Sequence, residues 1–122
     1  MEGSRHTLGL VDCVKVSYNS KSDKALARID TGAAKCSIDI EFAKKIDLVS
    51  KGKIAKIRSA NGRSSRELVH CTFHIGGKML DAEATLADRS HMRYKILIGQ
   101  NLLKAGKFIV DPLIDGNKRE CR

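Results

Sequence analysis

Two tight-turn dipeptides, Asn61-Gly62 and Gly76-Gly77, lie between stretches in which apolar and polar residues alternate. Asparagine and glycine tolerate the positive φ angles that a two-residue hairpin turn demands. The sequence therefore predicts three consecutive antiparallel strands, at residues 53–59, 64–75 and 79–87. A chain organised around such hairpins is expected to be mainly β.

Apolar periodicity predicts further strands at residues 8–18, with one interruption near Asp12, and at 24–30, 36–40, 94–99 and 108–110. Only two helices are predicted, and both are short. Asp39 is placed to cap the first, over 41–46, and the second covers 100–105. Residues 88–93 are expected to form a polar loop.

The apolar run that ends at Asp30 carries a carboxylate to the end of a strand, and Thr31, Gly32 and Ala33 follow it directly. A carboxylate between buried strands is costly unless hydrogen bonds compensate for its lost hydration. Thr31 offers a local hydroxyl, and Gly32 allows a tight turn. These residues alone leave two interpretations open, a carboxylate positioned for catalysis and an ordinary turn aspartate.

Basic residues outnumber acidic ones by 23 to 14, which gives a formal net charge of +9. Three interpretations fit this excess: binding of nucleic acid, recognition of an acidic peptide, and a well-solvated surface. Two tyrosines, three phenylalanines and no tryptophan provide no stacking platform, which argues against nucleic acid. For most of the lysines a solvated surface is the favoured interpretation. The cations gathered around one predicted hairpin would instead suit a glutamate-rich substrate, and they are Lys51, Lys53, Lys56, Arg58, Arg63 and Arg66.

The length predicts one domain, residues 1–122, with a core at 8–112 and a polar, loosely held tail at 113–122. No run reaches the roughly 20 apolar residues of a membrane-spanning helix, and the first residues lack a signal-peptide pattern. We therefore expect a cytoplasmic protein without a membrane partner. In that setting the four cysteines are expected to be reduced, namely Cys13, Cys36, Cys71 and Cys121.

Five separated motifs carry a family resemblance: Asp-Thr-Gly-Ala at 30–33, Arg-Ser-Ala-Asn-Gly at 58–62, Asp-Arg-Ser-His-Met-Arg-Tyr at 88–94, Leu-Ile-Gly-Gln-Asn-Leu-Leu at 97–103 and Phe-Ile-Val-Asp-Pro at 108–112. Together they resemble the retropepsin-like aspartic peptidases. The resemblance is to the group labelled ATP-dependent zinc protease, or RimB-like, which is associated with RimK-type glutamate ligases. Lys95 and Gln100 stand where that group commonly has proline and arginine.

The resemblance implies a closed retropepsin-like β-barrel and aspartic endopeptidase activity, with Asp30, Thr31 and Gly32 as the catalytic residues. Because the mechanism needs two carboxylates and the chain has one such motif, it also implies a homodimer. The hairpin at 53–75 would close over substrate as a flap. The residues expected to bind substrate are Ala33, Arg58, Ser59, Asn61, Gly62 and Arg66.

No cofactor is expected, despite the zinc and ATP in the group's label. The chain has neither a glycine-rich phosphate loop nor a His-Glu-x-x-His pair, and Cys71 and His74 would point to opposite faces of a strand. The association with glutamate ligases suggests a glutamate-rich tail as the substrate. The alternative is a dimeric binding module of the same fold that recognises acidic peptides without cutting them.

Overall fold

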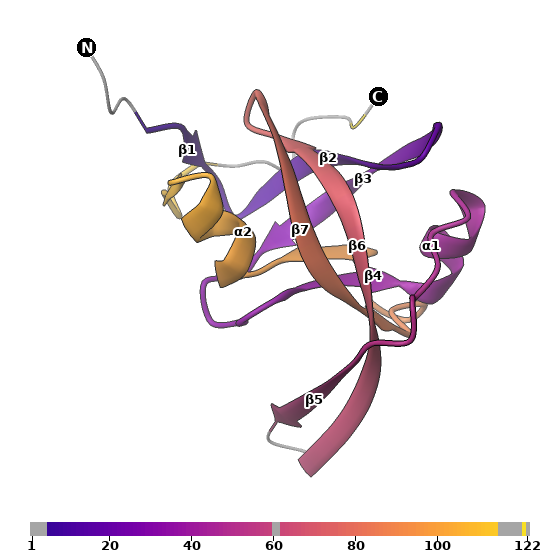
Figure 1. Cartoon of the computed structure of the whole chain (residues 1–122). Coiled ribbons are helices and arrows are strands. Elements are labelled where there is room, and N and C mark those ends of the chain that lie inside the picture. Colours follow the sequence, from indigo (N-terminus) through magenta and orange to yellow (C-terminus); the bar gives the residue numbers. More distant parts are fainter. Residues whose placement is uncertain (1–4, 60–61, 115–120, 122) are drawn as a thin grey trace.

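A six-stranded closed β-barrel forms the body of this computed structural model, which describes residues 5–59, 62–114 and 121 (Figure 1). Around the barrel the strands follow the order β2, β3, β8, β4, β7 and β6, and pairing between β2 and β6 closes it. Their bounds are β2 Val11–Tyr18, β3 Lys21–Ile29, β8 Ile96–Ile98, β4 Cys36–Asp39, β7 Lys78–Ala87 and β6 Gly62–Ile75. The predicted mainly β, closed-barrel fold is confirmed.

Two pieces lie outside this ring. Strand β5 (Ile54–Ser59) pairs only with β6, and the hairpin they form projects away from the barrel (Figure 1). Strand β1 (Thr7–Leu8) pairs in parallel with β9 (Ile109–Val110) as a separate two-stranded sheet.

The predicted hairpins are present. Gly76 and Gly77 have φ angles of +58° and +75° and join β6 to β7, as their turn chemistry predicts. At the other predicted turn, Gly62 already belongs to β6, where it pairs with Ser59. The expected turn residues Ala60 and Asn61 lie outside the described residues.

Alternate residues of the strands fill the barrel interior, because successive side chains point to opposite faces. The fully buried side chains include Val14, Val16, Ile38, Phe73, Ile96 and Ile98. Their aliphatic and aromatic surface is the main source of stability for the barrel.

Both helices are short, with six residues each, and pack against the barrel. Helix α1 (Ile40–Lys45) begins at Asp39, whose carboxylate accepts from the Phe42 amide, and it buries Phe42. Helix α2 (Gln100–Ala105) begins at Gly99 and buries Leu102 and Leu103. Within the described part of the chain, no helix is long and apolar enough to cross a membrane.

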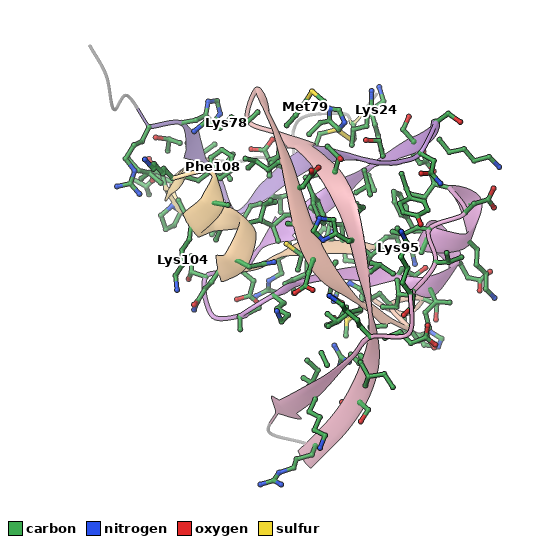
Figure 2. The ribbon with its side chains drawn as sticks, in the orientation of Figure 1. Lys24, Lys78, Met79, Lys95, Lys104 and Phe108 are labelled. Carbon is green, nitrogen blue, oxygen red and sulfur yellow. A yellow bond between two sulfur atoms is a disulfide. The ribbon has the colours of Figure 1, made fainter. Side chains whose placement is uncertain are left out.

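The turn between β6 and β7 contacts the far end of α2, where Figure 2 shows Lys78 beside Phe108. The Lys78 ammonium lies 5.3 Å from the centre of the Phe108 ring and donates to the Gly106 carbonyl. These contacts connect the residues after α2 to the β6–β7 turn.

Two predictions were wrong. The stretch at 8–18 is two elements, β1 and β2, and the break falls at Gly9 and not near Asp12. A Cβ on Gly9 would lie 2.8 Å from the Ile114 carbonyl oxygen, so a close approach of the distant chain end bends the strand there. Sequence periodicity does not reveal such an approach.

The cysteine prediction was also wrong for one pair. Cys13 of β2 and Cys121 form a disulfide, with Cα atoms 5.1 Å apart across a sequence separation of 108. Folding brings the two thiols together, and no local spacing in the sequence marks the pair. Cys36 and Cys71 are buried free thiols, as expected. The polar part of the tail, 115–120, lies outside the described residues.

Candidate active site

Asp30 directly follows the last residue of β3, at the mouth of a tight loop. Its amide donates to the Ile98 carbonyl at 2.9 Å, which ties the loop to β8. The Gly32 amide donates to Oδ1 of Asp30 at 2.8 Å, and the Asp30 carbonyl accepts from the Ala33 amide at 3.3 Å. The partly buried carboxylate is therefore oriented by the backbone of its own loop.

The first residue of α2 is hydrogen-bonded to this loop. The Gln100 amide donates to the Ala33 carbonyl at 2.7 Å, and the Gln100 side-chain amide donates to the Thr31 carbonyl at 2.7 Å. Gly99 passes so close that a Cβ there would lie 2.4 Å from the Lys35 carbonyl oxygen. Only a residue without a side chain fits at position 99, so the end of β8 lies directly against the loop.

Asn101 anchors the end of the loop with its side chain. Its Oδ1 accepts from the Cys36 amide at 3.1 Å, and its Nδ2 donates to the Glu83 carbonyl at 2.9 Å. Burial raises the pKa of the Cys36 thiol to about 11, so this thiol stays protonated at neutral pH. Cys36 is thus a packing residue under the Asp30 loop.

The β5–β6 hairpin faces the loop from the other side. From Gly62 to Glu67, β6 pairs only with β5, and its pairing with β7 begins at Leu68. Arg66 is partly buried. The predicted substrate-binding residues Arg58 and Ser59 lie in β5, but their side chains, like all of Asn61, are outside the described part of the structure.

A cleft of about 440 Å³ separates the hairpin from the Asp30 loop, and the structure brings Gly32, Ala33 and Arg66 together on its walls. Sequence analysis missed most of its other polar lining residues, Lys35, Ser37, Thr85 and Arg89, and assigned Lys56 no contact. Four lining side chains are cationic and none is acidic, and one of the four, Lys35, pairs with Glu83 at 3.2 Å. The cleft is therefore strongly electropositive.

Arg89 belongs to the stretch 88–94, which the sequence motifs singled out but which we had predicted only as a polar loop. It is 9% exposed. Its amide donates to Oδ1 of Asp39 at 2.7 Å, its Nε donates to the Tyr94 carbonyl at 3.0 Å, and Lys95 (Figure 2) donates to its carbonyl. Burial lowers the pKa of Arg89, and nearby Arg66 lowers it further.

Metal-ligating side chains do not converge anywhere in the described residues, where no three His, Cys, Asp or Glu side chains are placed to hold an ion. His70 and His91 are exposed. His74 hydrogen-bonds the Ser17 hydroxyl at 3.0 Å. In the described part of the chain, these histidines are therefore not grouped with other side chains that could bind the same metal ion.

Comparison with known proteins supports the same family. A family model described as retropepsin-like aspartic endopeptidase RimB matches residues 47–116. A probable alpha-L-glutamate ligase of Shewanella pealeana is 32% identical over 77 residues, which are 60% of this chain and 17% of that protein. The chain thus matches about a sixth of that relative's length.

Two solved structures have a similar fold. Protein Lpg0085 of Legionella pneumophila, of unknown function, superposes with a TM-score of 0.66 at 18% identity, covering 95% of this chain and all of that one. The protease of simian foamy virus (mac) superposes with a TM-score of 0.57 at 18% identity, covering 77% of this chain and 91% of the other. At this level of identity the likeness concerns the fold.

Proposed function

Since the chain belongs to the RimB-like family of retropepsin-like aspartic endopeptidases, we propose that it is a homodimeric endopeptidase that hydrolyses peptide bonds with one Asp30 from each subunit. The observation that carries the proposal is the oriented carboxylate of Asp30, fixed by the Gly32 amide at 2.8 Å. The residues that follow it in the same loop, Gly32 and Ala33, line an electropositive cleft of about 440 Å³.

In the proposed mechanism two Asp30 carboxylates meet at the dimer axis. Like charges this close cannot both ionise cheaply, so the pair shares one proton. The ionised partner takes a proton from a water molecule lying between the two, and the protonated partner polarises the scissile carbonyl. Thr31 braces the loop at the interface, and Gly32 keeps the backbone close to the carboxylate, where a Cβ would lie 3.2 Å from Oδ1.

Apolar side chains near this loop support dimerisation. Thr31 and Val110 line one depression together with Leu103 and Phe108, so the Asp30 loop adjoins the β1–β9 sheet. Around that sheet several large apolar side chains are exposed, namely Leu10, Ile109, Leu113 and Ile114. An uncovered apolar surface of this kind commonly forms a protein interface.

A glutamate-rich tail is the proposed substrate. The cleft presents four cations and no carboxylate, which suits a chain of negative charges. The relative named probable alpha-L-glutamate ligase agrees with a link to glutamate chemistry. A protease that trims such tails would oppose a ligase that adds them.

The test is mass-spectrometric detection of cleavage on a peptide with a polyglutamate tail and on a neutral peptide. We expect the wild type to cut the acidic peptide, and Asp30→Asn to lower the rate by roughly 1,000-fold while remaining dimeric in sedimentation. Asp23→Asn, at the opposite end of β3, is the matched control and should retain activity. Equal cleavage by wild type and Asp30→Asn would refute the aspartic mechanism.

The electropositive cleft also suits a second function, a dimeric module that binds acidic peptides without hydrolysing them. This alternative predicts micromolar binding of the polyglutamate peptide and no cleavage by the wild type at any pH from acidic to neutral. Nucleic-acid binding would instead show a steep loss of affinity with added salt and no preference for glutamate peptides.

A further inference from the structure

The floor of the cleft is a row of three residues from three neighbouring strands. Ser37 in β4 is in register with Thr85 in β7 and with Leu97 in β8, and all three line the cleft. The flanking residues Cys36 and Ile38 are fully buried in the barrel core. Because side chains alternate along a strand, the Ser37 row faces the opposite way, toward the hairpin.

Ser37 is the unusual member of this row. It is 5% exposed, and its hydroxyl has no hydrogen-bond partner among the residues that the structure describes. The Thr85 hydroxyl, by contrast, donates to the Cys36 carbonyl at 3.4 Å. A buried hydroxyl without a partner costs stability, so a polar group supplied by a ligand would relieve that cost.

Arg89 approaches the same floor from the loop after β7. The Asp39 carboxylate and the Tyr94 carbonyl hold its backbone and its Nε. Within the described ranges Arg89 forms no ion pair, and the bond from Nε is its one side-chain hydrogen bond. A guanidinium has five N–H donors, so its terminal nitrogens retain the capacity for a two-pronged contact with a carboxylate.

We propose that Arg89 and Ser37 form a carboxylate-binding subsite, which takes the side chain of a substrate glutamate next to the scissile bond. Arg66, which lines the same cleft from β6, lies on the hairpin side of that carboxylate. The inference rests on the proposed peptidase function, since it names the residues that select the substrate. It adds a buried, preorganised pair to the exposed cations of the hairpin.

Burial is what makes this pair selective. An exposed lysine attracts any anion through solvent, and salt screens that attraction. A desolvated guanidinium together with a serine hydroxyl requires a planar acceptor at a defined position. A neutral glutamine side chain there would add no negative charge beside Arg89 and Arg66, whose mutual repulsion the nearby Asp39 carboxylate only partly offsets, so glutamate is favoured.

The test measures binding in the Asp30→Asn background, where no peptide is cut. Fluorescence anisotropy gives the Kd of a tetraglutamate peptide and of its tetraglutamine counterpart. Arg89→Gln should weaken tetraglutamate binding by roughly 30-fold or more, because it removes one partner of a buried charge pair. Arg93→Gln is the matched control, because Arg93 is exposed on the same loop and does not line the cleft.

Ser37→Ala separates recognition from folding. Removing a hydroxyl that has no partner in the described structure should leave Tm unchanged or raise it. The same variant should lose roughly tenfold in affinity for tetraglutamate and almost none for tetraglutamine. This combination decides the proposal even if Arg89→Gln fails to fold.

The subsite is refuted if Arg89→Gln and Arg93→Gln weaken binding equally, or if Ser37→Ala binds tetraglutamate as well as its parent. These results are distinguishable from failure of the peptidase proposal. Tight, Arg89-dependent binding by a wild type that never cleaves would refute only the peptidase. Efficient cleavage of acidic peptides by Arg89→Gln would refute only the subsite.

Discussion

The two walls of the cleft are built in different ways. The Asp30 loop is tied by backbone hydrogen bonds to β8 and to α2, and Gly99 lies against it without room for a side chain. Among the described residues between Ile54 and Glu67, the strand pairing of the β5–β6 hairpin is between its own two strands, and the hairpin projects from the barrel (Figure 1). The position of the Asp30 loop is therefore fixed by its contacts with the barrel, whereas the conformation of the hairpin depends on its own turn and strands.

The two walls therefore suit different tasks: the Asp30 loop holds a side chain in a fixed position, and the hairpin supplies positive charge. The proposed catalytic role of Asp30 requires a carboxylate in a fixed position, and the hydrogen bonds to the Asp30 loop favour such a position. If the hairpin is the flap that the family resemblance implies, it has to open for substrate, and a segment with few contacts to the rest of the fold opens at low cost. The hairpin carries exposed cations such as Lys56 and Arg63, whose attraction for an acidic peptide does not require fixed positions.

Gly99→Ala should have the largest effect. A Cβ would lie 2.4 Å from the Lys35 carbonyl oxygen and 2.5 Å from its carbon, and neither backbone atom can move freely. We expect a loss of about 3 kcal/mol or more in the free energy of unfolding, measured by urea denaturation, and loss of cleavage.

The counterpart on the hairpin is Gly62→Ala. Gly62 has a φ of +112°, but no described atom lies within 4 Å of a Cβ built there. The cost should be about 1–2 kcal/mol, from backbone strain alone. Equal losses for the two variants would contradict the view that the loop is the tightly packed wall.

The rate at which the Cys36 thiol reacts with a thiol reagent should measure how often the Asp30 loop opens and exposes it. Burial raises its pKa from 9.0 to about 11, so at pH 8 the thiolate fraction is about 100-fold lower than that of an exposed thiol. A cysteine introduced at the exposed hairpin position Ser65→Cys should react with a thiol reagent at least about 100 times faster. Comparable rates would show that the loop opens as readily as the hairpin.

The same burial sets a dependence of stability on pH. Burial also raises the pKa of Cys71, to about 12, so the folded protein keeps protons that the unfolded chain releases above about pH 9. The stabilisation is complete below pH 9 and should be lost as the pH rises toward 11 and 12. Urea midpoints measured from pH 8 to pH 11 would check the sign.

Asn101→Ala should be next in size. It leaves the Cys36 amide and the Glu83 carbonyl without the partners that Asn101 supplies. We expect a loss of about 2 kcal/mol in the free energy of unfolding. Gln100→Ala, which removes one bond to the Thr31 carbonyl, should cost less than about 1 kcal/mol. A larger loss of stability for Gln100→Ala than for Asn101→Ala would mean that Gln100 contributes more than Asn101 to holding the loop.

The smallest effect on stability should come from neutralising the hairpin. Lys56→Gln combined with Arg63→Gln should change the free energy of unfolding by less than about 0.5 kcal/mol, because both side chains are exposed. The rate of cleavage of acidic peptides should fall several-fold at low salt, and the difference should shrink at high salt. A large loss of stability would mean that these two side chains make contacts that stabilise the fold, which would contradict the contrast between the hairpin and the Asp30 loop.

Local patterns in the sequence were enough to predict most of the barrel. Alternation and the Gly76-Gly77 turn located β6 and β7, and Asp39 marked the start of α1 to within one residue. The Asp30 loop was singled out by the resemblance of its Asp-Thr-Gly-Ala motif, together with the later Leu-Ile-Gly motif, to the retropepsin-like family, and the structure places Gly99 directly against that loop. Such signals depend on neighbours in the chain and can be read before folding.

Tertiary structure alone decided the rest. Ser37 and Arg89 line the same cleft because β4 lies between β7 and β8. The residues near Ser37 in the sequence do not indicate that its hydroxyl is buried without a described partner. The Cys13–Cys121 disulfide likewise depends on where the chain end meets β2. The physical reason is the same in both cases. Turn preference and periodicity are properties of adjacent residues, whereas burial, a missing partner and the charge of a cleft are properties of residues that only the fold makes adjacent.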